Sequence, residues 1–294
     1  MTIYSPIHTV NFRLLNAISV KRDDLIDPYI SGNKWRKLKY ILKDVEAKKK
    51  THLITFGGAY SNHLVATAAA ASRNNLKSTA FVRGEIVTNE MLLLCKLFGM
   101  DLIFTDRESY KNKPLLFSSH FGNNSQTYFI DEGGASEEAV IGCAEVIDEL
   151  TESYDHIFCA AGTGTTASGL LKGINNHKLQ TKLHVIPVLK GGSFIENEIQ
   201  QYEADLSNLQ IHTGYHFGGY AKTTPVLIQF IKDFTGETGM LIDPVYTAKM
   251  FYAINDLVSK NYFKKEDKIL AIHTGGLLGI LGMKEKLGGN LNRD

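Results

Sequence analysis

The sequence has 294 residues, with 32 Lys and Arg against 31 Asp and Glu, and a formal net charge of +1. This length is enough for one large or two modest domains with a sizeable buried core. The balanced charge argues against a surface for nucleic acid or acidic membranes, and no apolar run approaches the roughly 20 residues that a membrane-spanning helix needs. We therefore expect neither nucleic acid nor a membrane among its partners.

The amino terminus and the cysteines predict the compartment. The first residues lack a basic segment followed by a continuous apolar stretch, so they do not match a secretory signal. Cys95, Cys143 and Cys159 are widely spaced, which is typical of buried free thiols in a reducing compartment and of neither a disulfide framework nor a zinc site. We expect a cytoplasmic globular protein that binds no metal.

Segments typical of strands and of helices alternate along the chain. Strands are predicted for residues 52–56, 78–83, 101–105, 127–130, 155–160, 183–188 and 268–273. Helices are predicted after Lys34, from 63 to about 73, for 89–98, 136–150, from about 167, for 194–202 and 223–234, from Asp243 (N-cap) and Pro244 (first helical residue), and at the C-terminus. Residues 107–125 are ambiguous. The alternation predicts an α/β fold with parallel sheets covered by helices on both faces.

One lysine stands out by its position. Lys34 directly follows Gly32-Asn33, which is a turn signal, and precedes a helix with apolar residues at 38, 41, 42 and 45, the spacing of one helical face. Lys34 therefore lies at the start of that helix and outside its apolar stripe. Taken alone, a lysine at such a place is an ordinary surface residue.

A glycine-rich turn follows the strand predicted at 155–160. Its sequence is Gly162-Thr163-Gly164-Thr165-Thr166, and a helix follows it. Glycines let the backbone approach an anion, and the N–H groups and dipole of a helix N-terminus favour negative charge. Because no Gly-Lys-Ser/Thr ending and no G-x-G-x-x-G pattern is present, we predict a phosphate-binding loop of another kind, with an ordinary tight turn as the alternative.

Three further segments carry candidate residues. Gly57-Gly58-Ala59-Tyr60-Ser61-Asn62-His63 joins a strand to a helix, so that Ser61 or Asn62 either caps the helix or faces an anionic ligand. His63 is interpreted as a structural residue or as one that supports a ligand-contacting side chain. His273, in Ile272-His273-Thr274-Gly275-Gly276, is interpreted as a hydrogen-bonded core residue. Tyr246 and Thr247 are expected in the first turn of a helix, where Tyr246 alone is typical of a core aromatic.

Together, these motifs resemble the fold-type-II pyridoxal phosphate (PLP) enzymes, whose fold is that of the tryptophan synthase β subunit. Within them the chain is similar to the D-cysteine desulfhydrase and 1-aminocyclopropane-1-carboxylate (ACC) deaminase family. The resemblance rests on five motifs in the family's order: Gly-Asn-Lys-x-Arg-Lys-Leu at 32–38, Gly-Gly-x-x-Ser-Asn-His at 57–63, Thr-Gly-Thr-Thr at 163–166, Asp-Pro-Val-Tyr at 243–246 and His-Thr-Gly-Gly at 273–276.

The resemblance implies roles for these residues. Lys34 forms the Schiff base with PLP and later takes the substrate α-proton, and Asn62 hydrogen-bonds the 3′ oxygen of the pyridine ring. Ser61 meets the substrate carboxylate and assists proton transfer, and Tyr246 and Tyr220 are active-site tyrosines. The residues that hold the cofactor phosphate are Gly162, Thr163, Gly164, Thr165 and Thr166.

Two departures distinguish the branches of the family. Thr247 stands where the deaminase has a glutamate at the ring nitrogen, whereas the desulfhydrase branch has a threonine. A neutral hydroxyl makes the ring a weaker electron sink, which suits β-elimination better than the opening of a cyclopropane. The deaminase also has a tryptophan in the segment matching residues 85–89, and the only tryptophan of this chain is Trp35.

The sequence is thus interpreted as a two-domain enzyme. Residues 1–48 and 132–294 form the large domain, and 49–131 form a small inserted domain. The predicted activity is PLP-dependent β-elimination on a small amino acid, most directly D-cysteine. An ACC deaminase and a non-catalytic protein of this fold that binds an anionic metabolite are the alternatives. The resemblance also implies a homodimer.

Overall fold

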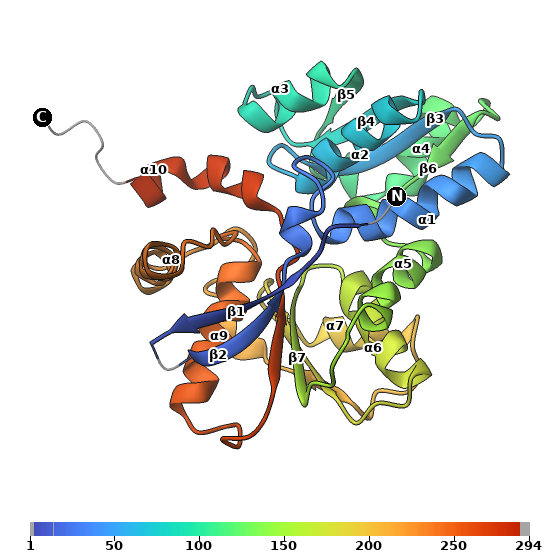
Figure 1. Ribbon diagram of the computed structural model, residues 1–294. Coiled ribbons are helices and arrows are strands. Elements are labelled where there is room, and N and C mark those ends of the chain that lie inside the picture. Colours follow the sequence, from blue (N-terminus) through green and yellow to red (C-terminus); the bar gives the residue numbers. More distant parts are fainter. Residues whose placement is uncertain (1–2, 14, 289–294) are drawn as a thin grey trace, which may run out of the picture. The chain divides into compact units, whose positions relative to one another are not determined.

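The computed structural model describes residues 3–13 and 15–288 (Figure 1). The chain divides into two units. The first unit comprises residues 1–26, 31–33 and 143–294, and the second comprises 27–30 and 34–142. The division differs from the expected one, since residues 27–30, 34–48 and 132–142 group with the segment 49–131. The helix that begins at Asn33 accounts for this, because its apolar stripe packs in the core of the second unit.

The first unit is built on a six-stranded sheet. The strands, in their order across the sheet, are β1 (Ile7–Phe12), β2 (Leu15–Lys21), β10 (Ile269–Ile272), β7 (His156–Ala161), β8 (Lys182–Pro187) and β9 (Leu209–Ile211). Neighbouring strands pair in parallel except β1 and β2, which form an antiparallel hairpin. The expectation of parallel sheets is therefore right for all but this hairpin, and β1, β2 and β9 were not predicted from the sequence.

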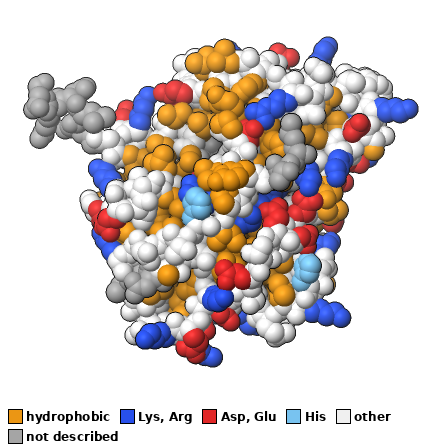
Figure 2. Space-filling view, viewed as in Figure 1, with side chains coloured by type: hydrophobic (Ala, Val, Ile, Leu, Met, Phe, Trp, Pro, Cys, Tyr) orange, Lys and Arg blue, Asp and Glu red, His pale blue; other side chains and the backbone are white. Residues whose placement is uncertain are grey.

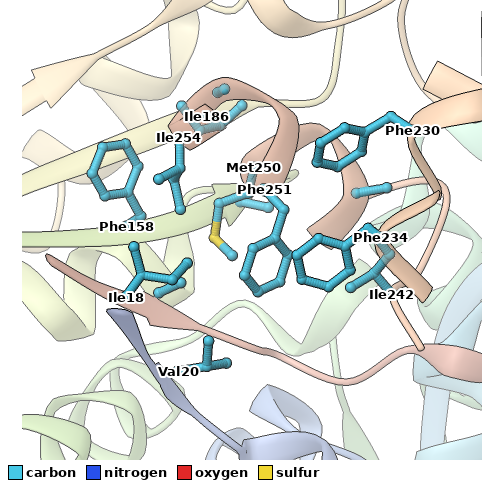
Figure 3. Close-up of a cluster of buried hydrophobic side chains, with 14 of the residues drawn as sticks. Ile18, Val20, Phe158, Ile186, Phe230, Phe234, Ile242, Met250, Phe251 and Ile254 are labelled. Atoms are coloured by element: carbon cyan, nitrogen blue, oxygen red, sulfur yellow. The ribbon is translucent and has the colours of Figure 1, made fainter. Parts of the chain in front are cut away.

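Helices cover both faces of this sheet, as Figure 1 shows. On one face α8 (Pro225–Thr238) and α9 (Thr247–Ser259) pack against inward-facing residues of β1, β2, β7 and β8. Figure 3 shows this cluster, in which Met250, Phe251 and Ile254 of α9 meet Phe158 and Phe234. On the other face lie α6 (Thr165–Asn176), α7 (Phe194–Gln200) and the end of α5 (Glu137–Asp148). Burial on both faces fixes the carboxyl ends of the strands in place.

The second unit has a four-stranded, wholly parallel sheet. Its order is β5 (Met100–Thr105), β4 (Lys77–Arg83), β3 (His52–Gly58) and β6 (Thr127–Phe129). The helices α1 (Asn33–Ala47) and α2 (Asn62–Arg73) share one core with Leu53 of β3. A second core gathers Phe56 and Phe81 with α4 (Lys113–Phe121), which lies in the segment that the sequence left ambiguous. The helix α3 (Glu90–Leu97) contacts α2 and β5.

Several helix starts follow from capping chemistry. Asn89 caps α3 by accepting a hydrogen bond from the Leu92 N–H at 2.9 Å, and Thr224 caps α8 ahead of Pro225. The expected helix start at Asp243-Pro244 is wrong, because α9 begins only at Thr247. The Asp243 carboxylate instead accepts the N–H groups of Val245 and Tyr246, and so makes a tight turn before the helix. The described part of the chain ends in a 3₁₀ segment (Leu277–Met283) and α10 (Lys284–Gly288).

Surface and interior agree with the composition. The three cysteines are buried and outside any disulfide, as predicted. On the face drawn in Figure 2, basic and acidic side chains are interspersed. Within residues 3–13 and 15–288, none of the helices has the length and apolar character required to span a membrane.

Candidate active site

The turn after β7 has the features of an anion cradle. Gly164 has a φ of 81° and is the N-cap of α6, and no side chain caps this helix. The first N–H groups of α6 are therefore left for a ligand, and the positive end of the helix dipole lies at the same place. Thr163 and Thr165 place their hydroxyl oxygens 3.1 Å apart at the mouth of the turn. The glycine conformation opens the helix N-terminus, so the turn can accept an anion.

Both predicted tyrosines lie beside this turn. A Cβ added to Gly162 would come within 3.2 Å of Cε1 and 3.4 Å of the hydroxyl of Tyr246, so a side chain at 162 would displace the tyrosine ring. The rings of Tyr246 and Tyr220 meet edge to face, with centroids 6.0 Å apart. Tyr246 is partly buried, whereas Tyr220 is 44% exposed. The first unit thus brings together Gly162, Tyr246 and Tyr220, which are far apart in sequence.

The residue before Lys34 also belongs to this cluster. The Asn33 side-chain amide donates to the hydroxyl of Thr166 at 2.9 Å, and the Asn33 backbone N–H donates to the carbonyl of Thr274. Gly32 has a φ of 59°, and a Cβ there would lie 1.9 Å from the Thr274 carbonyl oxygen. Only glycine permits this approach, so three of the sequence motifs meet here: the segment before Lys34, the phosphate loop and the turn after β10.

Thr247 is buried at the start of α9. Its hydroxyl accepts the Asp243 N–H at 2.7 Å and lies 3.4 Å from the Asp243 carbonyl. These bonds fix the orientation of the Thr247 side chain directly after Tyr246. The nearby Asp243 carboxyl is completely buried, and this burial raises its pKa to about 7. Position 247 thus presents a buried hydroxyl, which carries no charge, in a fixed orientation.

In the second unit, Lys34 occupies the first turn of α1, as predicted, and lies outside the apolar stripe that Leu38, Ile41 and Val45 form. Lys37, one turn later, is buried and donates to the carbonyl of Gly133 at 3.0 Å. Burial first, and then the positive charges of Lys34 and Lys37, hold the pKa of His63 well below its usual range. His63 is thus neutral beside these two lysines.

The turn after β3 supplies Ser61 and Asn62. Ser61 is the N-cap of α2, but its side chain makes no capping hydrogen bond. The alternative of a simple helix cap therefore finds no support, and the hydroxyl is available to a ligand. A Cβ added to Gly57 would lie 2.9 Å from the Ser61 Oγ, so this glycine makes the room that Ser61 occupies. Asn62, the first residue of α2, is partly buried.

Both histidines of the motifs are structural, as predicted. His63 is 2% exposed, and its Nε2 lies 2.7 Å from the hydroxyl of Thr55. His273 is fully buried, with Nε2 donating to the Leu241 carbonyl at 2.8 Å and Nδ1 accepting the Gly275 N–H at 3.3 Å. These pairings satisfy both rings within the fold.

Three polar residues near the predicted motifs escaped the sequence reasoning. They are Asn33, which bonds Thr166 of the phosphate loop, Lys37, which bonds the Gly133 carbonyl, and Lys249, which bonds the Gly219 carbonyl. For Lys249 the sequence offers no signal, because its neighbours along the helix face other directions and its partners are backbone carbonyls of distant segments. For the other two the sequence offers no signal apart from their place in the motif around Lys34.

The residues present fit a bound pyridoxal phosphate. The uncapped N-terminus of α6, with glycines where a Cβ would crowd the turn, fits a phosphate group. The primary amine of Lys34 fits a carbonyl group, because an amine can condense with it. The Ser61 hydroxyl, which no helix N–H engages, fits a carboxylate.

Comparison with known proteins identifies the family of the chain. A family model described as "Pyridoxal-phosphate dependent enzyme" matches residues 4–275. A putative ACC deaminase of Thermotoga maritima is 32% identical over 290 residues, covering 92% of both chains. The bifunctional mitochondrial D-cysteine desulfhydrase/ACC deaminase of Arabidopsis thaliana is 29% identical over 94% of this chain and 77% of the plant protein. A crystal structure of an ACC deaminase homologue superposes with a TM-score of 0.85 at 30% identity, covering 96% and 92% of the two chains.

The fold and the family match define a fold-type-II, PLP-dependent enzyme. Tomato threonine deaminase shares this fold with a TM-score of 0.70 at 15% identity. Within that class, the chain belongs to the family of ACC deaminase and D-cysteine desulfhydrase.

Proposed function

We propose that this enzyme catalyses β-elimination on D-cysteine. The overall reaction converts D-cysteine and water into pyruvate, ammonia and hydrogen sulfide. The single observation that carries this choice is the buried, neutral hydroxyl of Thr247 directly after Tyr246. The resemblance implies that the ring nitrogen of PLP meets this position, where a carboxylate would strengthen the ring as an electron sink. Elimination of a thiol needs a weaker sink than the opening of a cyclopropane.

Different residues bind the phosphate, the ring oxygen and the substrate carboxylate. The N–H groups at the start of α6 and the hydroxyls of Thr163 and Thr165 bind the phosphate. The Asn62 amide hydrogen-bonds the ring oxygen, and the Ser61 hydroxyl holds the substrate carboxylate. Thr166, fixed by the Asn33 amide, completes the phosphate loop.

The same residues move the protons. PLP, when bound, supplies the electron sink that stabilises negative charge at the substrate Cα. Lys34 Nζ would hold the cofactor and, as a free amine, would take the proton from the substrate Cα. Tyr246 and Tyr220, whose rings are in contact, place hydroxyl groups that can donate a proton to the departing sulfur. His63 is kept neutral, so it adds no charge beside Lys34.

The test is a product assay on the purified holoenzyme. D-cysteine, L-cysteine, D-serine and β-chloro-D-alanine are offered side by side and pyruvate is measured, while ACC is offered separately and 2-oxobutanoate is measured. Rapid release of pyruvate from the D-amino acids, with little or no 2-oxobutanoate, is the expected result. Production of 2-oxobutanoate alone would contradict the proposal and make the enzyme an ACC deaminase.

ACC deaminase is the second candidate. The names of several relatives favour it, including the putative deaminases of Thermotoga maritima and Pyrococcus horikoshii, each 32% identical to this chain. The name of the Arabidopsis relative joins both activities in one protein. The two candidates predict different products, so the same assay decides between them.

A further inference from the structure

A buried lysine on α9 bonds segments of the first unit that lie next to the candidate site residues. Lys249 is 0% exposed, and its ammonium donates to three backbone carbonyls: Gly219 at 2.8 Å, His216 at 2.9 Å and Val188 at 3.3 Å. Burial lowers its pKa to about 8, so it remains mostly protonated at neutral pH and has three N–H donors for three acceptors. Such a buried charge is tolerated only when it is fully hydrogen-bonded.

Each acceptor lies on a segment of the candidate site. Val188 follows β8, and its N–H bonds the carbonyl of Ala161, directly before Gly162 of the phosphate loop. His216 and Gly219 belong to the loop that ends in Tyr220. Lys249 itself is three residues after Tyr246, whose carbonyl accepts the Lys249 N–H. One ammonium therefore joins the residue after β8, which bonds the strand before the phosphate loop, to the Tyr220 loop and to the helix that follows Tyr246.

The Tyr220 loop, residues 216–222, needs such a support. Positive φ angles occur at Phe217, Gly218, Gly219 and Ala221 (51°, 93°, 115° and 53°), which are sparsely populated conformations for the two residues with a side chain. Its internal hydrogen bonds run from the Gly218 N–H to His216 Nδ1, from the Gly219 N–H to the His216 carbonyl and from the Lys222 N–H to the Gly219 carbonyl. In contrast α9 is firmly held, because Met250 and Phe251, next to Lys249, pack in the core shown in Figure 3.

We propose that Lys249 is the positioning residue that holds the Tyr220 loop against α9 and so sets Tyr220 beside Tyr246 for the reaction. The proposal rests on the proposed function in one respect only, namely that Tyr220 serves turnover. Lys249 acts through the backbone and touches neither substrate nor cofactor. A lysine suits this task because its ammonium can donate to three carbonyls in different directions.

The first test is hydrogen exchange on the full-length holoenzyme. In Lys249→Met, which keeps the length of the side chain but removes its donors, the amides of Gly219 and Lys222 should exchange at least about 10-fold faster, since their loop opens more often. Lys21→Met is the matched control: Lys21 is also buried and bonds the carbonyl of Ser5 and the carboxylate of Glu149. That variant should leave exchange at 216–222 unchanged. Equal protection of the loop in Lys249→Met and wild type would overturn the proposal.

The second test is a double-mutant cycle on kcat with Tyr220→Phe. If Lys249 acts through Tyr220, adding Lys249→Met to Tyr220→Phe should lower kcat by less than about 2-fold, although Lys249→Met alone lowers it by about 10-fold or more. If the two substitutions lowered kcat independently, so that their separate factors multiplied in the double variant, the coupling of Lys249 to Tyr220 would be refuted. If Lys249→Met does not fold, Lys249→Gln is used instead, because its side-chain amide retains two donors. The amides of the Tyr220 loop should then exchange faster than in wild type by less than about 10-fold, and kcat should be lower than in wild type by less than about 10-fold. A wild-type enzyme inactive on every amino acid would refute the proposed function, while the exchange result would still decide the role of Lys249 in the loop.

Discussion

At the scale of the residue, Lys34 carries the most specific prediction. Replacing it by Ala should remove the visible absorption of the bound cofactor and lower turnover at least about 100-fold, because the same amine is proposed to bind PLP and move the α-proton. Absorption spectra and pyruvate release measure the two effects. Lys43→Ala is the control, since Lys43 lies on the same helix, is exposed and only approaches the Tyr40 ring. Turnover retained in Lys34→Ala would show that another group is the base.

Thr247 gives a second residue-scale prediction. Thr247→Val keeps the shape but removes the acceptor of the buried Asp243 N–H, which should cost about 1–2 kcal/mol of unfolding free energy. The variant should also lose turnover, because the neutral partner proposed for the ring is gone. Thr181→Val removes another buried hydroxyl, which donates to the Tyr154 carbonyl, and should lower stability alone. Urea unfolding and pyruvate release separate the two outcomes, and full turnover in Thr247→Val would contradict the assigned role.

Whether a site residue could be predicted from the sequence depends on whether its interactions are local or distant along the chain. Lys34 and the glycines of the phosphate loop were found because a turn or a helix start imposes local rules that the sequence shows. Tyr220 and Tyr246 were identified by resemblance, and only the fold shows that their rings touch. Lys249 was missed because its partners are backbone carbonyls 30 to 61 residues away, which leave no mark in the sequence.

At the scale of the element, the turn after β7 makes its own prediction. Gly162→Ala introduces a Cβ that presses on the Tyr246 ring, so kcat should fall on the order of 10-fold with little change in thermal stability. Gly236→Ala is the control, because Gly236 lies in the exposed part of α8 with open space around it. That change should stabilise the protein by up to about 1 kcal/mol and leave turnover unaltered. Equal kcat in Gly162→Ala and wild type would show that the ring position is unimportant.

The same scale shows why some elements were missed. The long helices and the buried central strands follow directly from periodicity and capping. The hairpin of β1 and β2 has no Asn-Gly or Gly-Gly turn, and Arg13 enters the turn with a φ of 50°, so its connection gives no usual signal. The three residues of β9 are too few to show alternation. For α9, Asp243 is a good cap by type, but its carboxylate is used in a turn, so the helix starts later.

At the scale of the whole molecule, the sequence predicted the class of fold but divided the chain differently. Residues 34–48 were expected in the large domain, together with the phosphate loop and the two tyrosines. In the structure, α1 shares a core with α2, and Gly142 of α5 lies against the backbone of Arg36 in α1, where a Cβ would come within 1.9 Å of the carbonyl oxygen. Such close helix contacts depend on tertiary packing. Periodicity within one segment therefore does not reveal which unit a helix joins.

Buried histidines govern how the stability of the molecule depends on pH. His156, His184 and His212 lie on β7, on β8 and directly after β9, joined by nitrogen–nitrogen contacts of 2.9 Å, and His156 Nε2 lies 3.1 Å from the Asp267 carboxylate. Burial, followed by the charges of His212 and His156, lowers the pKa of His184 to about 3. Burial also lowers the pKa of His63, His212 and His273.

The sign of the effect follows from linkage. Between the unfolded pKa of about 6.5 and the folded pKa of His184 near 3, the unfolded chain binds more protons than the native one, so the free energy of unfolding should fall as the pH falls through this range. Each such histidine contributes a slope of up to about 1.4 kcal/mol per pH unit. His184→Gln removes one titrating group, so urea unfolding from pH 7 to pH 4 should give a shallower slope, whatever its stability at pH 7. If the slope of unfolding free energy against pH were unchanged, His184 would already be protonated in the native protein. The neighbouring rings of His156 and His212 would then accommodate the extra proton.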